Sequence, residues 1–164
     1  LMPFEETHIE EKTTKGNTTN QENHMNNQDL QLSQYKVLVV EDMKMNQFLM
    51  KQIFKRKKIK ADMASNGKEA IELLSQKAYD VVFMDLHMPV MDGRDATKII
   101  RDPNSSVLDH QVPIIGLSAD AFNKTREELI SLGMNDFLSK PVEIHEVYEK
   151  LLQLDEIKRQ AKGS

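Results

Sequence analysis

Cysteine, tryptophan and long apolar runs are missing from this chain of 164 residues, and each absence excludes a class of protein. Without cysteine there is no disulfide framework and no thiolate metal site, which fits a reducing compartment. Aromatic residues make up only 5%, so a stacking platform for nucleic acid is not expected. No apolar run approaches the ~20 residues of a membrane-spanning helix, and no signal-peptide pattern opens the chain. We therefore expect a cytoplasmic location without direct membrane contact.

The net charge of −4 is concentrated in the first part of the chain. Residues 1–34 contain six acidic residues and two lysines, so they carry the whole of it, and the remainder is neutral. Fourteen of these 34 residues are Asn, Gln or Thr, and the apolar ones follow no helical or strand period. Such a segment buries too little apolar surface to offset the entropy lost on ordering. We predict a disordered polar tail or interdomain linker over 1–34, with a short helix near 30–32 as an alternative.

Predicted strands and helices alternate from Tyr35 onward. Short β-branched or apolar runs predict five strands, and apolar residues at helical spacing predict five helices. This alternation predicts an α/β fold, a doubly wound parallel sheet covered by helices on both faces. The predicted domain covers residues 35–155, and 156–164 form a C-terminal extension. The strands are expected at 37–40, 61–64, 81–84, 112–117 and 134–138, and the helices at 44–57, 69–76, 96–101, 124–132 and 143–154.

Polar side chains follow four of the five predicted strands. Glu41 and Asp42 follow the first strand, Asp85 the third, Ser118 the fourth and Lys140 the fifth. The carboxyl ends of parallel strands meet at one edge of a sheet, where ligands bind in folds of this class. Any one of these residues could be polar simply because loops are polar. Three acids, a hydroxyl and a lysine in equivalent positions predict a functional site.

The charges in this cluster indicate its chemistry. Two carboxylates ~4 Å apart repel by roughly 4 kcal/mol at an effective dielectric constant near 20, so three together need a cation or raised pKa values. Mg²⁺, with Mn²⁺ as an alternative, prefers such oxygen ligands. A metal ion and a lysine beside a carboxylate stabilise a transferring phosphoryl group, and the carboxylate itself can be the nucleophile.

Four motifs, occurring in order, resemble the receiver domain of response regulators, the CheY-like family. They are VVED at 39–42, MDLHMPVMDG at 84–93, GLSA at 116–119 and SKP at 139–141. The resemblance extends over about residues 35–155 and implies a flavodoxin-like sheet with strand order 2-1-3-4-5. Glu41 in the acidic pair and Asn46, four residues after Asp42, resemble receivers attached to hybrid sensor histidine kinases. This implies the C-terminal receiver of such a kinase.

The resemblance implies which residues hold the metal ion and the phosphoryl group. Asp85 matches the phosphoacceptor. Glu41, Asp42, Asp85 and the backbone carbonyl of His87 match the metal ligands. Lys140 would pair with Asp85 first and with a phosphoryl oxygen later. Such a receiver catalyses its own phosphorylation and dephosphorylation and is not a turnover enzyme.

The resemblance also implies how phosphorylation is read. The Ser118 hydroxyl and the Phe137 ring match the switch pair, which would reshape the surface of the fourth helix, fifth strand and fifth helix. The backbone N–H groups of His87 and Ala119 would contact the phosphoryl group. Pro141 matches the residue after a cis peptide bond. Phe137 and Ser118 stand where many members have Tyr and Thr, so the first lacks a hydroxyl and the second keeps one.

Several readings of function remain open at this stage. The expected partners are a histidine kinase domain, on the same chain or another, and a histidine phosphotransfer protein. A parent protein could be membrane-anchored upstream. The first residue is Leu1 and not Met, which indicates an excised fragment. The alternatives are a single-domain response regulator, a binding module that is not phosphorylated, and a phosphatase of the haloacid-dehalogenase type. The last requires an acid where this chain has His87. No nucleic acid partner is expected.

A run of basic residues marks the end of the first predicted helix. One interpretation is docking of an acidic partner or of nucleic acid. The other, which we prefer from the sequence, is a solvated helix end where cations suit the helix dipole. The residues are Lys51, Lys55, Arg56, Lys57, Lys58 and Lys60.

Overall fold

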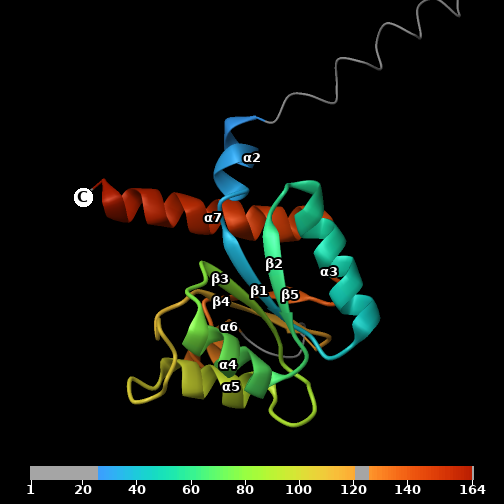
Figure 1. Ribbon diagram of the computed structural model, residues 1–164, viewed down its shortest axis with the longest axis vertical. Coiled ribbons are helices and arrows are strands. Elements are labelled where there is room, and N and C mark those ends of the chain that lie inside the picture. Colours follow the sequence, from blue (N-terminus) through green and yellow to red (C-terminus); the bar gives the residue numbers. More distant parts are fainter. Residues whose placement is uncertain (1–25, 121–125, 164) are drawn as a thin grey trace, which may run out of the picture. The chain divides into compact units, whose positions relative to one another are not determined.

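A five-stranded sheet forms the centre of the protein. The computed structural model describes residues 26–120 and 126–163. All the strands run parallel, in the order β2-β1-β3-β4-β5, which confirms the predicted fold (Figure 1). The strands are β1 (Lys36–Val40), β2 (Lys60–Ala64), β3 (Val81–Asp85), β4 (Ile114–Ser118) and β5 (Asp136–Ser139).

The described residues form six helices, one more than predicted. The additional helix, α2, covers part of the segment expected as a polar tail, and its last residue, Leu32, is 2% exposed in the core. The buried Leu32 side chain fixes the last turn of α2 to the core. The polar composition of the segment gave no indication of this contact. The helices are α2 (Asn27–Leu32), α3 (Lys44–Arg56), α4 (Gly67–Gln76), α5 (Gly93–Arg101), α6 (Arg126–Ser131) and α7 (Ile144–Lys162).

The helices divide between the two faces of the sheet. Successive strand side chains point to opposite faces, so alternate residues of β1 belong to different cores. Val37 and Val39 pack with α3 and α7, while Leu38 and Val40 pack with α4, α5 and α6. The three central strands, β1, β3 and β4, are apolar on both faces, and β3 and β4 are buried along their whole length. This two-sided burial explains why their sequences read as continuous apolar runs.

Side-chain caps fix where two of the helices begin. The Asn66 side chain accepts a hydrogen bond from the Glu69 backbone N–H at the start of α4. Asp92 does the same with the Asp95 N–H at the start of α5. Each cap satisfies a backbone donor that has no partner inside the helix.

Helix α7 extends well beyond the predicted end at residue 154 and takes up most of the expected C-terminal extension. Its last turns are held by polar contacts. Asp155 is 9% exposed and accepts a hydrogen bond from the Tyr35 hydroxyl at 3.0 Å. Lys158 lies over the Tyr35 ring and pairs with Asp80. Apolar periodicity cannot reveal a helix that packs through such contacts. The predicted fourth helix, 124–132, lies partly outside the described residues, and α6 is the part that is described.

The chain order in the sheet reverses between β1 and β3. The chain leaves β1 for β2 on one side and then returns to β3 on the other. Crossovers on opposite faces leave a crevice at the carboxyl ends of the two strands. Glu41 and Asp42 follow β1, and Asp85 ends β3, so the topology places all three acids at this crevice.

Candidate functional site

Lys140 joins two of the predicted site residues. Its Nζ atom lies 2.8 Å from Asp85 Oδ2 and 2.9 Å from Glu41 Oε2. Glu41 is 1% exposed and Asp85 4% exposed, so both carboxylates are largely removed from water. Burial alone would lower the pKa of Lys140, but the hydrogen bonds that its ammonium group donates to Asp85 and Glu41 raise this pKa above its ordinary value. The ammonium group therefore stays charged between the two acids.

Three carboxylates gather around this lysine. Glu41, Asp42 and Asp85 each offer an oxygen, and these oxygens lie within 4.8 Å of one another. One ammonium group leaves this set with an uncompensated charge of about −2. An oxygen-only donor set with excess negative charge fits a hard divalent cation such as Mg²⁺. Of the three residues, Asp42 is the most open to solvent.

Backbone groups hold the acids in position. The His87 N–H donates to Asp85 Oδ1 at 3.1 Å, and the Met43 N–H donates to Glu41 Oε1 at 3.2 Å. His87 also lies with its Nε2 atom 4.0 Å from Asp120 Oδ2, and both of these side chains are exposed. The loops after β3 and β4 thus approach each other beside the carboxylate of Asp85.

The predicted switch residues lie on the neighbouring strands. Ser118 ends β4 and is fully buried, and its Oγ atom accepts a hydrogen bond from the Asp120 N–H at 3.1 Å. Ala119, the next residue, is exposed. Phe137 on β5 is half-buried and packs against the core on the α4–α6 side. The peptide bond between Lys140 and Pro141 is cis.

Two residues that the sequence analysis missed support the site. Gln47 is 8% exposed, and its Nε2 atom donates to the Glu41 carbonyl at 2.6 Å, which ties α3 to the end of β1. Gly93 packs so closely that a Cβ atom there would lie 2.2 Å from the Asp85 carbonyl oxygen. In the sequence, Gln47 could have been found as a polar residue on the side of the predicted helix that faces the core. Gly93 could have been found as a glycine directly after an aspartate that caps a helix.

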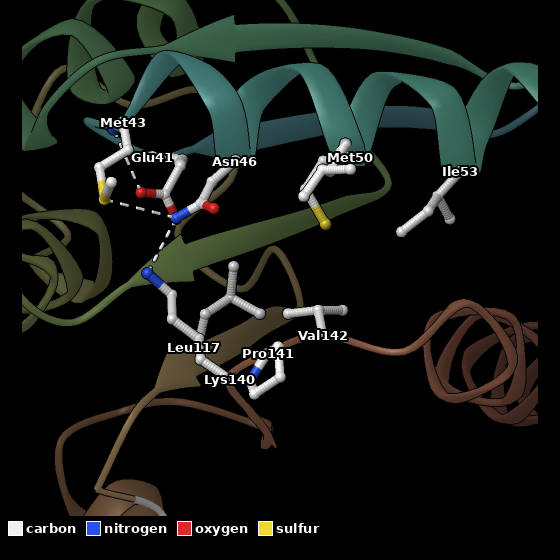
Figure 2. A pocket seen from close by; sticks show the side chains of 10 residues that line it. Glu41, Met43, Asn46, Met50, Ile53, Leu117, Lys140, Pro141 and Val142 are labelled. Atoms are coloured by element: carbon white, nitrogen blue, oxygen red, sulfur yellow. Dashed lines mark hydrogen bonds and ion pairs between the residues drawn. The ribbon is translucent and has the colours of Figure 1, made fainter.

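An apolar groove, which we call the α3 groove, begins at Glu41 and Lys140 and runs along α3 (Figure 2). Its volume is about 390 Å³. Asn46, Met50 and Ile53 of α3 form one wall, and Leu117, Pro141 and Val142 face them across the opening. The site therefore has a charged centre and an apolar flank on the α3 side.

Comparison with known proteins identifies the family. The profile of the family described as "Response regulator receiver domain" matches residues 37–152, which cover most of the predicted domain. This chain belongs to the response regulator receiver domain family.

The curated relatives of this receiver domain include long kinases. It is 34% identical over 146 residues to "Probable histidine kinase 1" of Oryza sativa subsp. indica. It is 35% identical over 126 residues to "Hybrid signal transduction histidine kinase B" of Dictyostelium discoideum. Both matches cover 72% of this chain but only 15% and 6% of the two relatives. The receiver domain thus corresponds to a small part of each.

Solved structures agree with the family. One is the receiver domain of the sensor histidine kinase PA1611 from Pseudomonas aeruginosa PAO1, with a magnesium ion in its active-site cleft. It is 32% identical, with a TM-score of 0.65 over 73% of this chain and 96% of that one. Another is the receiver domain of Ssk1 from Saccharomyces cerevisiae, in complex with the histidine phosphotransfer protein Ypd1. It is 30% identical, with a TM-score of 0.63 over 71% and 86%.

Among residues 26–120 and 126–163, none of the helices combines the length and the apolar composition that a membrane crossing requires.

Proposed function

We propose that this receiver domain accepts a phosphoryl group on Asp85 from a phosphohistidine and passes on the signal through a change of surface. The observation that carries the proposal is the position of Lys140, 2.8 Å from Asp85 within a cluster of three carboxylates. A carboxylate beside a cation and a metal-competent acid pair is equipped to act as a nucleophile toward phosphorus.

The chemical step exchanges one bond to phosphorus for another. A carboxylate oxygen of Asp85 attacks the phosphorus atom, and the bond from phosphorus to the imidazole nitrogen breaks. The nitrogen keeps the electron pair, and the donor's other ring nitrogen carries a proton during transfer, so that the histidine leaves as a neutral imidazole and not as an imidazolate anion. Lys140 would then move from the carboxylate to a phosphoryl oxygen as charge develops there. The Ser118 hydroxyl and the N–H groups of His87 and Ala119 would bind the other phosphoryl oxygens.

The three carboxylates fit Mg²⁺, with Mn²⁺ as an alternative. Glu41, Asp42 and Asp85 would hold the ion, with the backbone carbonyl of His87 as a further ligand. When bound, the ion neutralises charge on the phosphoryl oxygens and lowers the repulsion between the nucleophile and an anionic donor. The magnesium ion in the receiver domain of PA1611 supports this choice.

The readout would involve the strands beside the site. Ser118 ends β4 and Phe137 lies on the adjacent β5, where it is paired with Gly116. Movement of the serine hydroxyl toward a phosphoryl oxygen would free space for the Phe137 ring. The surface formed by α6, β5 and α7 would then change shape. Such a switch is a shift of population between two packings.

The relatives indicate the wider context. Because they are histidine kinases in which the matched part is small, we propose that this receiver domain belongs to a hybrid histidine kinase in the cytoplasm. The donor would be a histidine kinase domain on the same chain or another, and a histidine phosphotransfer protein would exchange the phosphoryl group, as the Ypd1 complex of Ssk1 suggests. A single-domain response regulator is the second candidate.

Mass spectrometry tests the proposed acceptor. The chain is incubated with Mg²⁺ and acetyl phosphate, a small phosphodonor, and then weighed. We expect a gain of about 80 Da, one phosphoryl group at one site. The gain should be lost in Asp85→Asn and when EDTA removes the metal ion.

Asp62→Asn is the matched control, since it removes an acid from the edge strand β2 and should keep the gain. Retention of the 80 Da gain, roughly one phosphate, in Asp85→Asn would show that another residue is the acceptor.

A further inference from the structure

A pocket lies at the amino end of the sheet, opposite the end that carries the acid cluster. It has a volume of about 360 Å³, a size that suits a small molecule. Lys36 of β1 and Lys60 and Asp62 of β2 line it from the sheet, and Lys77 and Tyr79 line it from the turn between α4 and β3. We call it the amino-end pocket.

Two lysines stand side by side in the amino-end pocket. Lys36 and Lys60 are register partners on β1 and β2, so their Cα atoms lie about 5 Å apart and their side chains leave the same face of the sheet. Two ammonium groups on neighbouring stems repel each other unless an anion lies between them. Within residues 26–120 and 126–163, no ion pair involves either lysine.

The acid of this pocket already has partners. Asp62 lies two residues after Lys60 and accepts hydrogen bonds from the Tyr79 hydroxyl at 2.6 Å and from Lys77 Nζ at 3.3 Å. Asp62 therefore balances the charge of Lys77 and leaves those of Lys36 and Lys60 uncompensated. Three lysines and one carboxylate give the amino-end pocket an excess charge of about +2.

Structural roles account for only part of this arrangement. β2 is an edge strand, and a lysine on an edge strand hinders pairing with another sheet. β1 lies between β2 and β3, so protection of an edge does not explain Lys36. Lys60 lies in β2 and not at the end of α3, so the dipole of that helix does not explain it. A negatively charged ligand explains both lysines.

We propose that the amino-end pocket binds a phosphate monoester. Such a group carries a charge of about −1.5 to −2 at pH 7, which matches the excess charge of the pocket. Because the stems of Lys36 and Lys60 start close together, both ammonium groups reach one compact anion and donate charge-assisted hydrogen bonds to its oxygens. The lysine stems and Ala78 offer apolar surface to the organic part of the ligand. The inference goes beyond the proposed function and does not depend on Asp85.

A titration followed by NMR of the ¹⁵N-labelled full chain tests the site. The probe is AMP, added in the presence of EDTA so that no metal ion can carry its phosphate into the acid cluster. We expect the amide signals of Lys36, Lys60 and Ala78 to shift together with one Kd. Adenosine, which has the same ring system without the phosphate, should leave them unchanged, and inorganic phosphate should compete with AMP.

Changes of charge in both directions sharpen the test. Lys36→Gln/Lys60→Gln should raise the Kd of AMP by about ten-fold or more, because two charge-assisted hydrogen bonds are lost. Asp62→Asn should lower the Kd, because it removes the negative charge from the pocket. Lys68→Gln/Lys98→Gln is the matched control, since it removes the same charge from α4 and α5 outside the pocket and should bind AMP like the unchanged chain.

The NMR spectrum of each variant also shows whether it is folded. If the double lysine variant is not, Lys60→Gln alone should raise the Kd in the same direction. A vesicle experiment identifies the source of the phosphate group. Cosedimentation with phosphatidylcholine vesicles only when they contain phosphatidic acid, lost in Lys36→Gln/Lys60→Gln, would assign the pocket to a lipid headgroup. Binding of AMP without binding to these vesicles would assign it to a soluble phosphate monoester.

Two results would refute the phosphate site. One is that AMP, inorganic phosphate and phosphatidic acid all leave the amide signals of the pocket unchanged. The other is that the lysine variant and the control variant bind AMP equally well. Neither result touches the proposed function, because Lys36→Gln/Lys60→Gln should still be labelled by acetyl phosphate on Asp85.

Discussion

Replacing Lys140 by Met should destabilise the protein in a way that a divalent cation partly reverses. Lys140 is the one basic residue in contact with the acid cluster among the described residues. Methionine has a similar shape, so it keeps the packing of the lysine stem while it removes the charge. The variant leaves Glu41, Asp42 and Asp85 within 4.8 Å of one another without a neighbouring ammonium group.

The distances set the size of the effect. Contacts of 2.8 and 2.9 Å correspond to an attraction of about 6 kcal/mol each at an effective dielectric constant near 20, before the desolvation of the lysine is subtracted. Removing one partner of a buried ion pair costs about 3–5 kcal/mol in total. Because the Lys140 side chain remains 22% exposed, water screens part of this interaction, and we expect a loss of about 3 kcal/mol.

Urea denaturation in EDTA and in excess Mg²⁺ measures this loss and its reversal. The variant should unfold at a lower urea concentration in EDTA, with an unchanged slope. Mg²⁺ should then stabilise the variant more than the unchanged chain, because the ion no longer competes with the ammonium group for the same oxygens. The cation thereby takes over part of the charge neutralisation.

Lys150→Met is the control for this experiment. Lys150 pairs with Asp136 at 2.6 Å and is 21% exposed, so its environment resembles that of Lys140, but it lies away from the acid cluster. Its loss should not change the response to Mg²⁺. The reasoning would be refuted if Lys140→Met kept the stability of the unchanged chain in EDTA, or if Mg²⁺ stabilised it less.

Three further changes test the packing and the electrostatics. Gly93→Ala should cost about 1–3 kcal/mol by overpacking, and a calorimetric Tm together with weaker acetyl phosphate labelling would show the displacement of Asp85. Phe54→Ala should cost about 3–5 kcal/mol in urea denaturation, since this ring is fully buried against Phe83. The hydrogen bond from Tyr79 holds the pKa of Asp62 below its ordinary value, so Asp62 stabilises the fold above about pH 4, and this is lost as the pH falls through the lowered pKa. Asp62→Asn should therefore be less stable than the unchanged chain at neutral pH, and the difference should shrink below about pH 4.

The sheet and the position of the site could be predicted because they depend on burial. Val81–Asp85 is buried on both faces, so its sequence is a continuous apolar run that ends where the chain emerges at the crevice. The same rule located Ser118 and Lys140 at the ends of neighbouring strands. A parallel sheet aligns these ends, so the distance along the chain between Asp85 and Lys140 is no obstacle to their contact.

Features that depend on particular polar contacts could not be predicted. The last turns of α7 are held by Asp155, which is buried only because it meets Tyr35, a residue 120 positions earlier in the chain. Burial raises the pKa of Tyr35 above its ordinary value, and the hydrogen bond to Asp155 raises it further. The support of Glu41 by Gln47 is of the same kind. Such pairs are visible only when the tertiary structure brings both members together.

The acid cluster and the exposed face of α3 share a physical origin, because in each the isolated domain retains groups that only another molecule can satisfy. Three carboxylates around one ammonium group repel one another, and a divalent cation would relieve this repulsion. Phe48 and Leu49 are exposed to water, where an apolar partner surface would cover them. The carboxylate repulsion and the exposed apolar side chains both lower the stability of the domain. The two apolar cores on either side of the sheet offset this loss and hold the site in place without a ligand. In the proposed function, the cation and the partner each remove one of these costs at the point where the phosphoryl group is transferred. The binding energy gained there is thus available to bring the histidine and Asp85 into line.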